Sequence, residues 1–159
     1  MAKETKTNAM RILDREKIEY QVNLYECEEF IDGVSIADML GQKYENSYKT
    51  LVLQGKSGGH YVCAVQIHKE IDLKAAARAF SEKSVEMIHV KDLLSLTGYI
   101  RGGCTPIGMK KQFPVIVDIT AESQEKIIIS GGRIGAQIFI SPKDLIKVTR
   151  GRFCDIQVK

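Results

Sequence analysis

Hydrophobic and polar positions follow two different periods along the chain, and these periods separate predicted strands from predicted helices. Tyr20, Val22 and Leu24 recur at every second position, which is typical of a strand that carries them on one face. Met10 and Leu13 recur at helical spacing instead. The same reading of the whole chain predicts strands over residues 20–25, 49–54, 60–68, 85–89, 114–119, 126–129, 136–140 and 153–158, and helices over 5–18, 35–40, 72–80, 90–96 and after Ser141.

Capping residues support several of these helices. Asp72 is a candidate N-cap for the alanine-rich helix that follows it, and Ser35 with Asp38 three residues later is typical of a capping pair. Gly41 and Gly98 follow helical runs and are natural helix stops, because glycine accepts the left-handed conformation found just beyond a helix.

Helices and strands mix without strict strand–helix–strand alternation. We therefore expect an α/β fold with a mixed or antiparallel sheet, curved into a barrel-like core with helices outside. The chain has 159 residues, 44% of them hydrophobic, so we expect one domain over residues 1–159. The N-terminal residues are too polar for a signal peptide, and no apolar run reaches the roughly 18 residues of a membrane span. A soluble, cytoplasmic protein with no membrane partner is the expectation.

Two glycine-rich segments flank the apolar strand over 114–119. The first, Gly98-Tyr-Ile-Arg-Gly-Gly-Cys-Thr-Pro-Ile-Gly108, holds four glycines and a proline, which neither a helix nor a central strand tolerates. The second is Ser130-Gly-Gly-Arg-Ile-Gly135. Such loops bring backbone N–H groups close to a ligand, where they can hold an anion or a developing oxyanion. Alternatively, each segment is only a tight turn.

The net charge of +3 is unevenly distributed. Residues 14–45 carry nine acids and three bases, whereas residues 126–159 carry seven bases and two acids. Residues 98–112 add three bases and no acid. A basic half that includes both glycine-rich segments suits a polyanionic partner such as the acceptor end of an RNA, although an ordinary solvated surface would show a similar charge pattern.

Few residues are candidates for chemistry. Lys49 opens a strand that is otherwise suited to burial, so its stem can lie on apolar surface while its ammonium group reaches a cleft, or it can be an exposed strand end. Gly55-Lys-Ser57 lacks the preceding glycine and the following helix of a phosphate loop, and predicts a hairpin turn.

No protein nucleophile is evident from the sequence. There is no Gly-x-Ser-x-Gly motif, and no serine or cysteine has an identifiable histidine and acid partner. Cys104 lies within the first glycine-rich segment, where it is either a reactive thiol or a small filler residue. The four cysteines are widely separated and no histidine lies at metal-ligand spacing, so we expect reduced thiols, no metal and no cofactor.

Three segments taken together resemble the YbaK/EbsC family, the bacterial free-standing relatives of the prolyl-tRNA synthetase editing domain. They are Tyr48-Lys-Thr-Leu51, the first glycine-rich segment with Lys110-Lys111, and Ser130-Gly-Gly-Arg-Ile-Gly135. The resemblance extends over nearly the whole chain, including Asp72–Ala76 and Phe153–Ile156. It implies the fold of that editing domain and a deacylase that clears cysteine from mischarged tRNA(Pro), with Cys-tRNA(Cys) as a further substrate.

The resemblance also implies roles for individual residues. Lys49 would position the sugar and phosphate of the acceptor end, and the amides of Gly102 and Gly103 would hold the ester carbonyl. Members of the family have no catalytic nucleophile of their own. Instead, the thiol of the bound cysteine attacks its own ester carbonyl, and the cysteine is released as a cyclic thiolactone. The residues implied in substrate binding are Tyr25, Phe30, Cys104, Thr105, Pro106, Ser130, Gly131 and Gly132.

The sequence departs from the family pattern in the glycine-rich segment and ahead of Gly33. Cys104 stands where the family commonly has an aliphatic residue, and Arg101 replaces an apolar one. The acidic segment before Gly33 is shorter than in other members, and Phe30 is a possible replacement for the pocket wall it supplies. Beside the deacylase, with prolyl-tRNA synthetase as its expected partner, three alternatives remain: a deacylase for another small amino acid, a non-catalytic module that binds tRNA or a synthetase, and a thiol redox enzyme built on Cys104.

Overall fold

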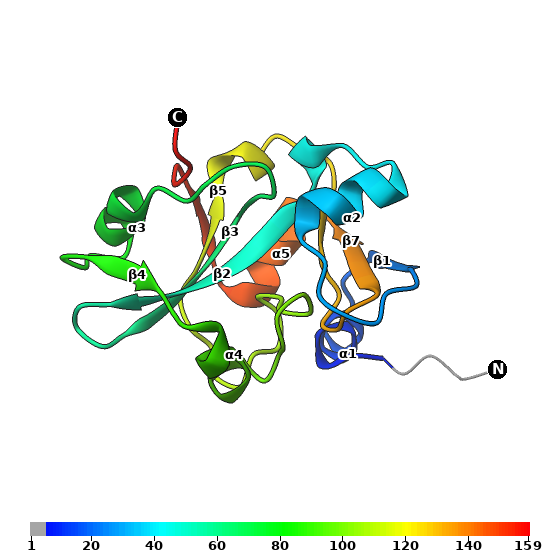
Figure 1. The fold of residues 1–159 in the computed structure, drawn as a ribbon, viewed down its shortest axis with the longest axis horizontal. Coiled ribbons are helices and arrows are strands. Elements are labelled where there is room, and N and C mark those ends of the chain that lie inside the picture. The colour runs from blue at the N-terminus through cyan, green and yellow to red at the C-terminus, as the bar shows by residue number, and fades with distance from the viewer. Residues whose placement is uncertain (1–5) are drawn as a thin grey trace.

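The computed structural model describes residues 6–159, which form an α/β fold with two β-sheets (Figure 1). The five-stranded sheet has the order β4-β2-β3-β5-β8 and the three-stranded sheet the order β1-β7-β6. The strands are β1 (Tyr20–Leu24), β2 (Tyr48–Gly55), β3 (His60–Gln66), β4 (Val85–Met87), β5 (Val115–Asp118), β6 (Ile127–Ser130), β7 (Ala136–Ile140) and β8 (Arg152–Cys154). The helices are α1 (Asn8–Arg15), α2 (Gly33–Leu40), α3 (Leu73–Ala79), α4 (Val90–Thr97) and α5 (Pro142–Thr149), with short 3-10 turns at Tyr44–Asn46 and Ile119–Ala121.

Strand pairing makes the larger sheet mixed. β2 and β3 form an antiparallel hairpin in which Lys49 pairs with Val65, while β3–β5 and β5–β8 are parallel pairs. The hairpin turn is closed by Gly55, whose N–H donates to the carbonyl of Gly59 over 2.8 Å. A parallel bridge between Ser47 and Ile128 joins the two sheets where β2 passes β6. The expected α/β fold with a mixed sheet is confirmed.

The larger sheet is buried on both faces at β3, whose successive side chains point in opposite directions. Val62 and Ala64 belong to a core that α1, α5 and the smaller sheet complete. Cys63 and Val65 belong to a second core that is covered by α3. All four side chains are fully buried. β3 is thus a central strand, and β2 beside it is held in a fixed position.

The helix ends agree with the sequence in three places and differ in one. Gly41 and Gly98 adopt left-handed φ values of 68° and 85° at the ends of α2 and α4, and Asp72 caps α3. The expected capping pair of Ser35 and Asp38 is wrong. α2 begins earlier, at Gly33, and its N-cap is Asp32, whose carboxylate accepts the Ser35 N–H over 2.9 Å.

The outer elements are shorter than the sequence suggested. The first helix spans Asn8–Arg15 instead of residues 5–18, of which residue 5 lies outside the described part. Pairing in the last strand stops after Cys154 and resumes only as a bridge between Ile71 and Gln157. Within residues 6–159, no helix is both long enough and apolar enough to span a bilayer.

Candidate functional site

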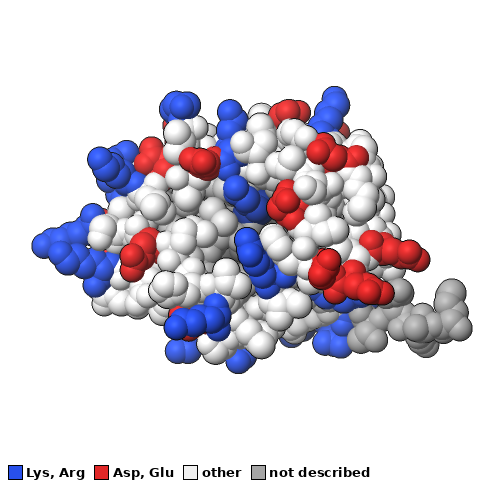
Figure 2. All heavy atoms as spheres, viewed as in Figure 1, with Lys and Arg blue, Asp and Glu red and all other residues white. Residues whose placement is uncertain are grey.

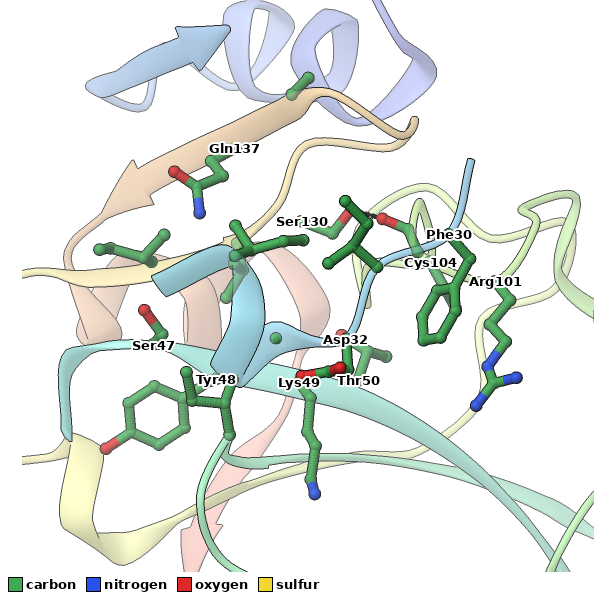
Figure 3. Close-up of a pocket in the computed structure, with 18 of the residues that line it drawn as sticks. Phe30, Asp32, Ser47, Tyr48, Lys49, Thr50, Arg101, Cys104, Ser130 and Gln137 are labelled. Carbon is green, nitrogen blue, oxygen red and sulfur yellow. Dashed lines mark hydrogen bonds between the residues drawn. The ribbon is translucent and has the colours of Figure 1, made fainter. Parts of the chain in front are cut away.

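A cavity of about 370 Å³ opens beside the start of β2, between the segment before α2 and the first glycine-rich segment. Its volume is at the lower end of the range for small-ligand sites, roughly 300–1,000 Å³. Figure 3 shows side chains from β2, β7 and the loops around α2 and Cys104 converging on it. Of the residues predicted to form the site, those that line the cavity are Tyr25, Phe30, Lys49, Gly102, Cys104 and Ser130.

The other predicted residues lie behind this lining. They are Gly103, Thr105, Pro106, Gly131 and Gly132, none of which is among the described residues that line the cavity. Thr105 is fully buried and Pro106 is buried as well, so both support the loop from within. The Gly131 N–H already donates to the carbonyl of Ala136 over 2.8 Å. These residues therefore shape the glycine-rich loops without facing the hollow.

The first glycine-rich loop turns sharply at the cavity. The Gly103 N–H donates to the carbonyl of Ile100 over 2.9 Å, and Gly102 between them has a φ of 89°. Glycine at the third position of such a type II turn avoids the strain that a side chain would suffer. The turn uses the Gly103 amide and leaves that of Gly102 without a hydrogen-bond partner among residues 6–159. Gly102 is thus one of the lining residues whose amide this loop can offer to a ligand.

The two glycine-rich loops are in direct contact. The Ser130 hydroxyl donates to the carbonyl of Gly102 over 3.2 Å. A Cβ added to Gly103 would stand 2.8 Å from the Cα of Arg133, which only glycine avoids. A Cβ added to Gly102 would stand 3.1 Å from Phe30 and 3.2 Å from Ile134. The close packing of the loops thus requires glycine, and each loop holds the other in place.

Lys49, the second residue of β2, lines the cavity and is about half buried. Burial lowers the pKa of its ammonium group below the ordinary value, and the negative charge of Glu70 opposes this effect. Loss of hydration favours the neutral form of a lysine, which an anion in the cavity would reverse. The position of the Lys49 ammonium group is therefore suited to binding a negatively charged ligand.

Phe30 and Arg101 form the rim of the cavity (Figure 3). The guanidinium carbon of Arg101 lies 4.0 Å above the centre of the Phe30 ring, a cation–π contact. Phe30 also packs over Gly102, as its approach to the added Cβ shows. The aromatic wall therefore comes from Phe30, and Arg101 adds a positive charge beside it.

Cys104 lines the cavity with a thiol that is kept protonated. Its side chain is 8% exposed, and burial raises its pKa to about 12. Tyr25, on another wall, also has a raised pKa, chiefly because of burial. Neither group is ionised near neutral pH, so neither is an activated nucleophile. No group of three His, Cys, Asp or Glu side chains within residues 6–159 is arranged to hold a metal ion.

The sequence prediction missed several polar residues of the lining. Gln137 is a lone polar side chain in β7, where it accepts hydrogen bonds from Gln42 at 2.9 Å and Asn23 at 3.1 Å. Its position in an otherwise apolar strand was the available signal. Asp32 and Thr50 also line the cavity. Asp32 lies in a run of acids that the sequence does not distinguish from one another. The signal for Thr50 was its position directly after Lys49.

Charges of both signs meet at this site. Of the described residues that line the cavity, Lys49 and Arg101 are basic and Asp32 is acidic. Figure 2 shows basic side chains flanking the central hollow of this face, with an acidic side chain beside them. The site can therefore receive a ligand that carries both an anionic and a cationic group.

Comparisons with known proteins converge on one family. The sequence model of the aminoacyl-tRNA editing domain matches residues 32–148. A protein of Enterococcus faecalis named "Putative Cys-tRNA(Pro)/Cys-tRNA(Cys) deacylase EbsC" is 42% identical over 155 residues, which are 97% of this chain and 94% of that protein.

Solved structures share the fold. The crystal structure of the hypothetical protein APE2540 superposes with a TM-score of 0.87 at 20% identity, covering 95% of this chain and 99% of that one. A crystal structure described as "a putative trans-editing enzyme for prolyl tRNA synthetase" superposes with a TM-score of 0.82 at 21% identity, covering 98% and 100%. At these identities the likeness concerns the fold alone.

Proposed function

Because the chain belongs to the aminoacyl-tRNA editing domain family, we propose that it is a trans-editing deacylase that removes cysteine from mischarged tRNA(Pro). Cys-tRNA(Cys) is a second substrate of the same chemistry, in line with the name of the Enterococcus faecalis relative. One observation carries the proposal: a cation and an unpaired backbone amide, Lys49 and Gly102, line one cavity that offers no activated nucleophile.

Because the cavity supplies no activated nucleophile, the attacking group comes from the substrate itself. The thiol of the bound cysteine loses its proton and its sulfur bonds to the ester carbonyl carbon. The ester C–O bond then breaks, the ribose hydroxyl of the tRNA takes up a proton, and cysteine leaves as a thiolactone. The Gly102 N–H stabilises the oxyanion that forms on the carbonyl, a contribution typically worth about 10²–10³ in rate. Tyr25, Phe30 and Ser130 shape the wall around the small side chain.

Lys49 acts on the nucleic-acid part of the substrate. Its ammonium group binds the phosphate and sugar of the terminal nucleotide, which compensates for the loss of hydration that lowers its pKa. A cavity of about 370 Å³ holds only the aminoacylated end of a tRNA. Selection of the tRNA body therefore falls to a partner, for which prolyl-tRNA synthetase is the proposed candidate.

A deacylation panel tests the proposal. Wild-type protein is incubated with Cys-tRNA(Pro), Cys-tRNA(Cys), Ala-tRNA(Pro) and Ser-tRNA(Pro), each with and without prolyl-tRNA synthetase. We expect rapid loss of cysteine and slow loss of alanine and serine, which have no thiol. Binding of tRNA without turnover would instead identify a non-catalytic module, and faster loss of alanine or serine would identify another substrate.

The same panel tests Lys49. Lys49→Met keeps the apolar stem and should lower kcat/KM about 10- to 100-fold, because a hydrogen bond to a charged group is lost. Lys56→Met, in the exposed hairpin turn at the other end of β2, should leave it unchanged. Since the pKa of Lys49 is lowered, the ratio of wild-type to Lys49→Met rates should decline as pH rises through that value. Equal rates for the two proteins would contradict the assigned role.

A further inference from the structure

Asp32 brings the negative charge of the cavity, and its carboxylate is only partly used by the fold. It accepts the N–H of Ser35 over 2.9 Å and the hydroxyl of Ser35 over 3.0 Å. These two hydrogen bonds lower its pKa, so the group is ionised at neutral pH. Within residues 6–159 it forms no ion pair, although Lys49 and Arg101 line the same cavity. An ionised carboxylate without a cationic partner thus faces the ligand space.

The chemistry of an aminoacyl ester matches this distribution of charge. Its phosphates are anionic and suit Lys49 and Arg101, whereas its α-amino group is a cation one carbon from the ester carbonyl. Positive side chains repel an ammonium group, and Asp32 is the one carboxylate within the described lining that can form an ion pair with it. Figure 3 shows Asp32 on the segment that leads into α2, on the side of the cavity that β2 borders.

We propose that Asp32 binds the α-ammonium group of the aminoacyl ester and thereby selects substrates with a free amine over N-blocked ones. The inference rests on the proposed function, since it concerns the same site. It predicts that the cavity discriminates against N-acetylated aminoacyl esters and peptidyl esters, whose amide nitrogen carries no charge. The selectivity arises from charge, because the uncharged amide nitrogen of an N-blocked substrate cannot form an ion pair with the Asp32 carboxylate.

The structural role of Asp32 can be separated from this one. Asp32 is the N-cap of α2, and asparagine is as good an N-cap as aspartate. Asp32→Asn therefore removes the charge and keeps the cap. Asp72 offers a matched control, because it caps α3 through the same contact, to the Ala75 N–H over 3.0 Å, but does not line the cavity.

Binding of stable analogues tests the inference without depending on turnover. The probes are 3′-cysteinylamino-3′-deoxyadenosine 5′-phosphate and its N-acetyl derivative, whose amide bond resists deacylation. We expect calorimetry to show that wild-type protein prefers the free amine at least about 10-fold, that Asp32→Asn abolishes this preference by weakening the free-amine probe alone, and that Asp72→Asn behaves as wild type. Thermal unfolding should give Asp32→Asn the melting temperature of wild type within about 2 °C.

Several outcomes would overturn the inference. A free-amine preference that Asp32→Asn retains would show that Asp32 is a helix cap only. Equal binding of both probes to wild type, or no binding of either, would show that the cavity does not read the amine. Failure of the proposed function is distinguishable, because it would appear as absent deacylation of Cys-tRNA(Pro) even where the free-amine probe binds selectively.

Discussion

At the scale of single residues, the thiol of Cys104 decides between a thiol enzyme and substrate-assisted chemistry. Burial raises its pKa to about 12, so the thiol stays protonated near neutral pH. We predict that Cys104→Ala keeps kcat/KM for Cys-tRNA(Pro) within about threefold and costs about 1 kcal/mol of stability. Deacylation assays measure kcat/KM, chemical denaturation measures the stability, and alkylation by iodoacetamide in the folded protein measures the reactivity of the wild-type thiol. Rapid alkylation of Cys104 together with loss of activity in Cys104→Ala would support the thiol alternative.

Residue type and local pattern indicate some members of the site and not others. Lys49 could be anticipated, because the ammonium group of a lysine at the start of an apolar strand must reach either solvent or a cleft. Asp32 could not, since residues 26–32 contain several acids and only the start of α2 shows which one faces the cavity. Gly103 illustrates a second limit. Its amide is used within the loop by Ile100, which depends on turn geometry that composition does not reveal.

At the scale of elements, the two glycine-rich loops function as a pair. We predict that Gly103→Ala lowers kcat/KM about 10- to 100-fold, because its Cβ would stand 2.8 Å from the backbone of Arg133 and push the loops apart. Overpacking should also cost about 1–3 kcal/mol. Steady-state kinetics and chemical denaturation measure these effects.

Gly41→Ala serves as the control for Gly103→Ala. At Gly41 a Cβ meets nothing within 4 Å, but φ is 68°, so the substitution strains the backbone outside the cavity lining. It should cost about 1–2 kcal/mol and leave kcat/KM unchanged. Full activity in Gly103→Ala would show that contact between the loops is not needed for the site.

Hydrophobic periodicity predicts which segments form strands and helices more readily than it predicts which strands pair with one another. β3 was predictable as a strand, since Val62, Cys63, Ala64 and Val65 form an apolar run ahead of a polar turn. Its parallel partner β5 lies about fifty residues further along the chain, and no local pattern specifies that pairing. The start of α2 was placed two residues late, because Ser35 with Asp38 matches a capping pair in the sequence, whereas the structure uses Asp32 as the N-cap.

At the scale of the whole molecule, charge is unevenly distributed along the chain and over the face that bears the cavity. Residues 14–45, which include β1 and α2, carry most of the excess acid, and residues 126–159 carry an excess of base. On the face that bears the cavity, Figure 2 shows acids gathered on the side of β1 and α2. An acidic flank repels the tRNA backbone, so the acceptor end should enter from the basic side.

Salt dependence measures how many phosphates the molecule contacts. If Lys49 and Arg101 contact two phosphates of the single-stranded acceptor end, log(kcat/KM) should fall against log[salt] with a slope of about −1.4, or about sevenfold between 50 and 200 mM. Arg101→Met should reduce that slope by about half. A cysteinyl-adenosine ester without phosphates provides the control and should react at a rate independent of salt. A slope beyond about −4 would reveal an extended tRNA-binding surface, and a slope near zero would remove phosphate binding from the site.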